Sequence, residues 1–525
     1  MGNKKPADDR ARPLSARRLG MIASLLAASV LLSRIMGFAR EMVLAARIGL
    51  GRSADAYYAA FQIPDLLNYL LAGGALAVAF TPLYLKTLRQ EGDASAHRLF
   101  QTVLGTLGMG VVLATGILWF YAEELVDLQF GAFDPETREL TVFLTRIVLP
   151  GQIFFVAGGI VRAVLMAHGR FFAQAMAPIL YNGSIIIGGL LSQTVEGFAW
   201  GALVGALLGG WIFPAWDFRH VGSMGFRVAP LDPGFRVYLW GALPLMIGLS
   251  LTTVDEWYER FFGARLGVGV VAALAFARRL MMAPVAIVGQ AVATATLPSL
   301  SALHAEGRES EMNDIFLNTL RGTWVLASLA GGILFSLAQP LIQLAYQRGA
   351  FDAQDTARVA ILLAWMSCAI PGWVIQQVAV RAFFARNEMW RPMFLSTVLS
   401  VGALPLYLEM GREWGAEGLV IAGAVAINVN AILTVGWTRW RHGGPFLRPL
   451  LSTGLRGLAV ALLASVAAYW VQIGGEGTMG AVLDIAAGSV VYGLTALAGV
   501  WVLGDAAMRN TLSVISRSFV RRMRR

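Results

Sequence analysis

Long apolar stretches separated by short polar linkers recur along the whole chain. A helix needs about 20 largely apolar residues to cross a bilayer, and about fourteen stretches approach or exceed that length. Continuous apolar runs such as 203–212 and 458–471 lack the alternation of a β-barrel strand. The pattern therefore predicts an all-α integral membrane protein. The predicted spans are residues 19–47, 55–86, 98–121, 139–166, 171–193, 196–216, 236–264, 269–300, 316–346, 355–384, 391–409, 415–437, 452–474 and 481–504.

Composition agrees with a membrane protein, since 57% of the 525 residues are hydrophobic and only 14% are charged. A single cysteine, Cys368, excludes an internal disulfide, and five scattered histidines indicate no metal cluster. We find no phosphate-binding loop and expect no catalytic residues and no cofactor. Transport would then be driven by Na⁺ or H⁺ coupling or by the membrane potential.

Lysine and arginine in the linkers predict the orientation, because cytoplasmic loops carry the excess of both. Both ends of the chain are strongly basic, whereas the linker between the third and fourth spans is acidic apart from Arg138. An even number of spans places both termini in the cytoplasm. The net charge of +10 then reflects topology and anionic lipid headgroups, with no need for nucleic acid. The polar segment before Leu19 shows no small-residue cleavage site, so the first helix is expected to be retained.

A short motif occurs twice and indicates an internal repeat. Residues 46–51 read Ala-Arg-Ile-Gly-Leu-Gly, and residues 264–269 read Ala-Arg-Leu-Gly-Val-Gly, 218 positions later. In that register Glu41 pairs with Glu259, and Pro82 falls near Pro298. Six spans separate the copies, which predicts parallel lobes related by an axis along the membrane normal. The alternative is chance similarity between two helix pairs of like composition.

The repeat suggests a division of the chain into six segments. They are a basic cytoplasmic segment (1–18), an N-terminal six-helix lobe (19–217), a cytoplasmic linker (218–235), a C-terminal six-helix lobe (236–437), helices thirteen and fourteen (438–504) and a basic cytoplasmic tail (505–525).

Arginines occur within the spans, where a charge costs at least about 2.5–3.5 kcal/mol on insertion scales. Arg34 lies near the middle of the first span, with Arg40 and Glu41 further toward the outside, and Arg278 and Arg279 lie near mid-depth in the eighth. One arginine from each lobe would make a cationic cavity suited to a phosphate or diphosphate. Alternatively, Arg34 pairs with a carboxylate and locks the lobe, and the side chain of Arg278 extends toward the membrane–water interface.

The seventh span carries an acidic cluster near its outer end. Glu256 and Arg260 are spaced i,i+4 and are expected to neutralise each other, whereas Asp255 and Glu259 have no partner evident from the sequence. Asp255 and Glu259 could form a coupling site for Na⁺ or H⁺, or belong to an extracellular salt-bridge gate. In the second span, Asp55 could simply cap the start of its own helix.

Several motifs resemble those of the MurJ (MviN) family. The opening signature comprises Ser33-Arg34-Ile35-Met36-Gly37-Phe38-Ala39-Arg40-Glu41, Ala54-Asp55-Ala56 and Phe61-Gln62-Ile63-Pro64-Asp65-Leu66-Leu67. Later landmarks in the expected order are Gly169-Arg170-Phe171, Ala177-Pro178 with Asn182, Arg279-Leu280-Met281, Leu297-Pro298-Ser299-Leu300 and Arg348-Gly349-Ala350-Phe351.

The resemblance implies a fourteen-helix fold of the multidrug/oligosaccharidyl-lipid/polysaccharide exporter superfamily in the bacterial inner membrane. It also implies export of lipid II, the undecaprenyl-diphosphate-linked peptidoglycan precursor, by a transporter that is not an enzyme. A monomer surrounded by membrane lipids is expected. The residues predicted to contact the substrate are Ser33, Arg34, Arg40, Glu41, Asp55, Asn68 and Arg279.

The second span departs from the family pattern. The family typically carries an arginine and a Glu-Gly pair where this chain has Asn68 and Gly73, which supply neither charge. The diphosphate contact must then be weaker, differently arranged or supplied elsewhere.

We expect the two lobes to rock about the cavity while the polyprenyl tail stays in lipid, along helices thirteen and fourteen as the resemblance implies. A flippase for another polyprenyl-diphosphate glycan, or a cation-coupled multidrug exporter of the same fold, is the alternative. A membrane-embedded glycosyl- or acyltransferase would need a larger polar loop than any linker here provides.

Overall fold

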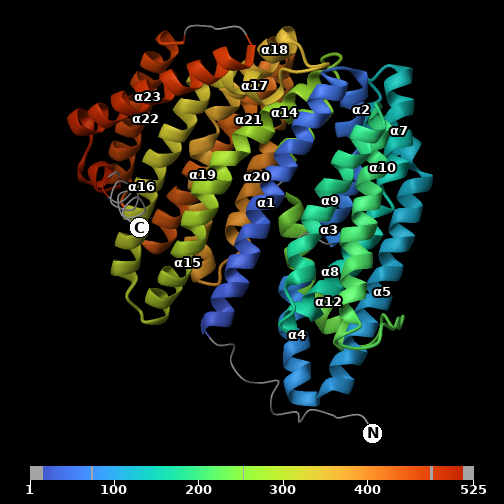
Figure 1. Cartoon of the computed structure of the whole chain (residues 1–525). Coiled ribbons are helices and arrows are strands. Elements are labelled where there is room, and N and C mark those ends of the chain that lie inside the picture. Colours follow the sequence, from blue (N-terminus) through green and yellow to red (C-terminus); the bar gives the residue numbers. More distant parts are fainter. Residues whose placement is uncertain (1–15, 72–74, 252–253, 473–476, 512, 514–525) are drawn as a thin grey trace. The chain divides into compact units, whose positions relative to one another are not determined.

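The computed structural model describes residues 16–71, 75–251, 254–472, 477–511 and 513, and all regular structure within these ranges is helical (Figure 1). Long apolar segments form helices because every backbone polar group is then satisfied inside the segment, as a lipid environment requires. The predicted all-α class is confirmed.

Contacts between backbone positions divide the chain into two compact units. The first comprises residues 1–43, 63–122 and 143–246, and the second comprises 44–62, 123–142 and 247–525. The sequence-based lobes were drawn differently, because they placed residues 44–62 and 123–142 with the N-terminal half. The lobe boundaries themselves stay a prediction.

In the first unit, α8 packs against α5 and the π-helix η2. Three helices of this unit, α1, α3 and α12, extend at one end into residues of the second unit. In chain order the helices of the first unit are α1 (Ala16–Ile48), α3 (Gln62–Leu71), α4 (Ala75–Glu91), α5 (Asp93–Phe120), α8 (Gly151–Ala167), α9 (Phe172–Leu191), α10 (Val195–Gly205), η2 (Ala206–Ile212), α11 (Phe213–Phe218) and α12 (Pro233–Leu251).

The helices of the second unit include α16, α22 and α23, which lie side by side in Figure 1. In chain order they are α2 (Arg52–Ala60), α6 (Ala122–Phe130), α7 (Pro135–Val148, continuing into the first unit), α13 (Val254–Gly263), α14 (Val270–Pro284), the π-helix η3 (Val285–Gly289), α15 (Gln290–Ala305), α16 (Glu309–Ser336), α17 (Ala338–Tyr346), α18 (Ala353–Ser367), α19 (Ile370–Ala385), α20 (Trp390–Gly402), α21 (Leu404–His442), α22 (Leu447–Trp470) and α23 (Gly477–Leu503).

Nine helical segments of the described chain are long and apolar enough to cross a membrane, or up to eleven if each of two bent pairs forms one span. One segment, 390–442, covers two predicted spans and contains a break at Gly415, whose φ is 57°. Predicted spans 55–86 and 236–264 are each interrupted by residues outside the described ranges. The expected number of fourteen therefore stays a prediction.

Equivalent points of the two repeat copies share backbone features. Pro82 lies inside α4 and Pro298 inside α15, and each helix is followed by a glycine with positive φ, Gly92 at 87° and Gly307 at 71°. A proline inside a helix removes one backbone hydrogen bond and favours a bend. The two copies thus share an internal proline and a left-handed glycine after the helix.

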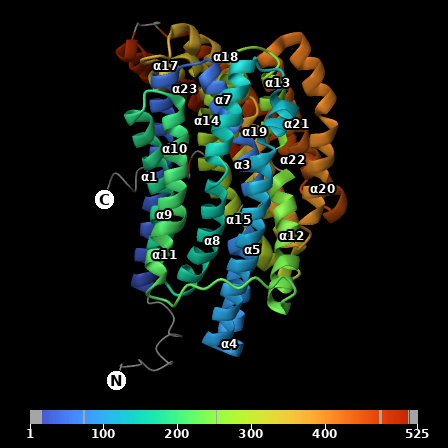
Figure 2. The same cartoon turned by 90° about the vertical axis from the view of Figure 1, so that its right-hand side faces the viewer.

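Glycines allow very close helix contacts in the first unit. A Cβ at Gly188 of α9 would lie 2.2 Å from the carbonyl oxygen of Gly197 in α10, and these helices run side by side in Figure 2. A Cβ at Gly158 of α8 would lie 1.4 Å from the carbonyl oxygen of Gly210 in η2. Such contacts replace the hydrophobic driving force that helices lack in lipid.

Candidate functional site

The first cluster of predicted site residues lies on α1. Arg34 is exposed, and Ser33 beside it is half-buried. Further along, Arg40 forms an ion pair of 2.5 Å with the buried Glu41 and donates a hydrogen bond of 3.2 Å to the Oδ1 atom of Asn182 in α9. The charge of Arg40 is therefore balanced within the first unit.

Asn68 joins two helices of the first unit. Its side-chain amide on α3 donates a hydrogen bond of 2.8 Å to the Oε1 atom of Gln152 on α8. This contact fixes the side chain in a polar interhelical pair, and a role in substrate binding stays a prediction. Gly73, the other departure from the family pattern, lies outside the described residues.

Asp55 caps a helix far away in the sequence. The carboxylate on α2 is 1% exposed and accepts hydrogen bonds from the backbone amides of Gly269 and Ala272 at the start of α14, the latter at 2.8 Å. Gly269 has a φ of 83°, and α14 has no side-chain cap of its own. Asp55 thus satisfies amides that would otherwise be unpaired and stabilises the positive end of the helix dipole.

Arg278 on α14 supplies the partner that the sequence did not reveal for two carboxylates of α13. Its guanidinium lies 3.0 Å from Asp255 and forms two contacts with Glu259, of 3.0 and 2.5 Å. Glu259 is 4% exposed. Its carboxylate and the hydroxyl of Tyr407 both lie next to Gly423. The predicted Glu256–Arg260 pair is confirmed. Cation coupling at Asp255 and Glu259 stays a prediction.

Arg279, the neighbour of Arg278, is exposed on α14. The two units show one pattern twice: each has an arginine paired with carboxylates, Arg40 or Arg278, and an exposed arginine on the same helix, Arg34 or Arg279. A guanidinium stays charged and donates in a fixed fork, which suits a phosphate or diphosphate. Each unit by itself can offer an arginine to an anionic ligand.

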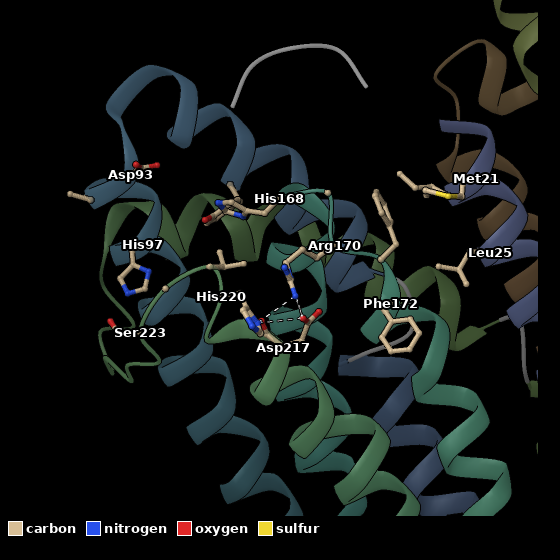
Figure 3. A pocket seen from close by; sticks show the side chains of 17 residues that line it. Met21, Leu25, Asp93, His97, His168, Arg170, Phe172, Asp217, His220 and Ser223 are labelled. Carbon is tan, nitrogen blue, oxygen red and sulfur yellow. Dashed lines mark hydrogen bonds and ion pairs between the residues drawn. The ribbon is translucent and has the colours of Figure 1, made fainter. Parts of the chain in front are cut away.

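A cavity of about 1000 Å³ opens in the first unit beside Arg170 and Asp217 (Figure 3). His97, His168 and His220 line it. The Arg170 guanidinium lies against the buried carboxylate of Asp217, so its charge is already balanced. Across the described residues, no group of three or more His, Cys, Asp or Glu side chains is arranged to hold a metal ion.

Comparisons with known proteins identify a family. Residues 44–485 match the family model "Lipid II flippase MurJ". The chain is 30% identical over 457 residues to the "Probable lipid II flippase MurJ" of Rhizobium meliloti (strain 1021), covering 84% of each protein. It is 28% identical to the "Lipid II flippase MurJ" of Burkholderia cenocepacia, covering 77% of this chain and 80% of the relative.

Solved structures share the fold. The structure "Lipid II flippase MurJ, inward closed conformation" matches with a TM-score of 0.76 at 20% identity, over 90% of this chain and 97% of that chain. An inward-facing multidrug resistance transporter of the MATE family matches with a TM-score of 0.67 at 16% identity, over 78% and 94% of the two chains.

Proposed function

We propose that this chain, which belongs to the MurJ family of lipid II flippases, moves lipid II from the inner to the outer leaflet of the bacterial cytoplasmic membrane for peptidoglycan synthesis. It acts as a multi-pass transporter and carries out no chemical step. Both termini face the cytoplasm, in keeping with the basic linkers.

The exposed arginines carry the proposal. Arg34 in the first unit and Arg279 in the second are exposed on helices that would lie inside a membrane. An arginine within a membrane span is a candidate for binding an anion, and diphosphate is the anionic group of lipid II. We infer that Arg34 and Arg279 each contact the diphosphate during transport, while Arg40 and Arg278 hold the helices that present them.

Alternating access needs contacts that form in one state and break in another. The hydrogen bonds from Gly269 and Ala272 to Asp55 are the contacts we propose for this role. They join α2 and α14 within the second unit, although the sequence assigns these helices to different predicted lobes. They would hold the outer ends together while the headgroup loads from the cytoplasmic side. The polyprenyl tail would stay in lipid along α22 and α23, where Leu455, Leu462 and Leu494 are each at least 64% exposed.

The membrane potential favours the proposed direction. When the inside is negative, outward movement of a negative charge releases about 2.3 kcal/mol per charge per 100 mV. A cation-coupled multidrug exporter of the same fold would instead be expected to expose acidic and aromatic side chains in its cavity.

Depletion complementation tests the function. A bacterium whose own lipid II flippase is shut off should survive on the wild-type chain and lyse on a correctly inserted chain carrying Arg34→Ala together with Arg279→Ala. Failure of the wild-type chain despite membrane insertion would reject lipid II as the substrate and favour another polyprenyl-diphosphate glycan.

A further inference from the structure

Arg162 on α8 is a cation without a carboxylate partner among the described residues. Its Nε atom donates to the Oε1 atom of Gln174 on α9 at 3.1 Å, and Nη1 donates to the carbonyl oxygen of Gly210 in η2 at 3.4 Å. A guanidinium has five N–H groups, so these two neutral contacts leave most of its donors for another acceptor. The contrast is Arg170 in the same unit, whose charge Asp217 balances.

The π-helix η2 helps to position Arg162. Gly158 lies one turn earlier on α8 and is pressed against Gly210, the residue whose carbonyl oxygen accepts from Arg162. Single-turn π-helical segments often occur at functional sites, because they redirect backbone groups. The guanidinium is therefore held between α8, α9 and η2 and is not simply extended toward water.

The other repeat copy carries an equivalent arginine. Val161-Arg162-Ala163 recurs 219 positions later as Val380-Arg381-Ala382 on α19, and Pro150-Gly151 at the start of α8 recurs 221 positions later as Pro371-Gly372 at the start of α19. The two helices also stop alike, because positive φ occurs at Gly169, at 73°, and at Asn387, at 59°.

Arg381 likewise has no carboxylate partner within the described chain. Its Nε atom is buried without a hydrogen-bond partner, and its guanidinium lies 5.4 Å from the centre of the Phe384 ring.

The depth of both arginines favours a lipid ligand. Arg162 precedes the end of α8 at Ala167 by five residues, and Arg381 precedes the end of α19 at Ala385 by four. At 1.5 Å per residue each lies about one to two turns from the helix end, which is near the level of the lipid phosphates for a helix that ends at the membrane surface. Phosphate is the anion of that layer, and it matches the guanidinium fork.

We propose that Arg162, with Gln174, forms a binding site for the phosphate or diphosphate group of a membrane lipid, and that Arg381 forms its counterpart in the other repeat. The site is separate from the exposed arginines of α1 and α14. If the proposed function holds, the preferred occupant is the polyprenyl diphosphate before it reaches Arg34 and Arg279. Only the preference for polyprenyl diphosphate rests on the proposed function, and the phosphate site itself does not.

Equilibrium binding to the full-length protein in zwitterionic nanodiscs tests the site. The probes are farnesyl diphosphate, phosphatidylglycerol and inorganic diphosphate, measured in the wild type and in a chain carrying Arg34→Ala with Arg279→Ala. Lipid-borne phosphate should still bind the double variant. Arg162→Gln or Arg381→Gln in that background should weaken binding about tenfold, the effect of losing a charged hydrogen bond.

Arg162→Lys should lose less than Arg162→Gln, because it keeps the charge without the fork. The matched control is Arg146→Gln on α7, whose side chain contacts Trp119 and which should leave binding unchanged. Equal elution and melting temperatures exclude misfolding as the cause of any loss.

The outcomes separate the two proposals. Binding of phosphatidylglycerol alone, dependent on Arg162, would support the site with bulk phospholipid as its source and count against a polyprenyl substrate. Lipid binding that disappears in the Arg34→Ala, Arg279→Ala chain, or that Arg162→Gln and Arg381→Gln both leave intact, would overturn the site and leave the proposed function standing. Equal binding of inorganic diphosphate would show a free-anion site and also overturn it.

Discussion

Arg278 holds the charge balance of α13, because its single guanidinium contacts both Asp255 and Glu259. Removing one partner of a buried ion pair strands the other charge and costs about 3–5 kcal/mol, whereas neutralising both can be nearly neutral. We therefore expect Arg278→Gln to lower the melting temperature strongly. Arg278→Gln combined with Asp255→Asn and Glu259→Gln should recover most of the loss in a thermal unfolding assay.

A triple variant as unstable as Arg278→Gln would contradict this account and show that packing, not charge, accounts for the stability. Arg412→Gln is the control, since Arg412 is 79% exposed and should change the melting temperature very little.

Asp55 provides a second test at the scale of one side chain. Asp55→Ala leaves two amides of α14 without their acceptor, and helix caps contribute about 0.5–2 kcal/mol. We expect a lower melting temperature and reduced complementation. Asp352→Ala is the matched control, because Asp352 caps α18 through one amide and is exposed. A larger effect at Asp352 would argue against a special role for Asp55.

Spacing along one helix was enough to predict the Glu256–Arg260 pair, since residues four apart face each other. It was not enough for Arg278, which lies on another helix, or for Asp55, which caps α14 at a distance of more than 200 residues. Such partners depend on packing that no local pattern encodes.

The closest helix contacts in the first unit depend on glycines, because a larger residue would keep the backbones apart. Alanine at Gly158 would place its Cβ against the carbonyl oxygen of Gly210, so α8 and η2 must separate. Overpacking of this kind costs about 1–3 kcal/mol. We expect Gly158→Ala to lower the melting temperature, whereas Gly116→Ala on α5, where nothing lies within 4 Å, should not. Equal melting temperatures of the two variants would contradict this packing.

The apolar pattern predicted where helices occur better than where they break. Residues 55–86 read as one span, yet the described part forms α2, α3 and α4. Pro64 lies in the first turn of α3, where a missing amide hydrogen costs nothing, so the proline marks a start that hydropathy alone cannot show.

At the scale of the whole molecule, hydropathy was sufficient to predict an all-α membrane protein, and the short motifs were sufficient to predict membership of the family. Fold class and family depend on composition and on short local sequences, which a single chain displays directly. The driving force follows from neither. Because Arg278 occupies Asp255 and Glu259, we expect replacement of Na⁺ by K⁺ to leave transport unchanged and collapse of the membrane potential to slow it. Na⁺-dependent transport that Asp255→Asn abolishes would instead identify a coupling site.

The central claim is that the exposed arginines of α1 and α14 carry the diphosphate of lipid II across the membrane. The most direct test measures the appearance of lipid II in the outer leaflet of cells that depend on this chain. The account predicts full exposure with the wild type and loss of exposure with Arg34→Ala plus Arg279→Ala at equal protein levels. Undiminished exposure with that double variant would contradict it.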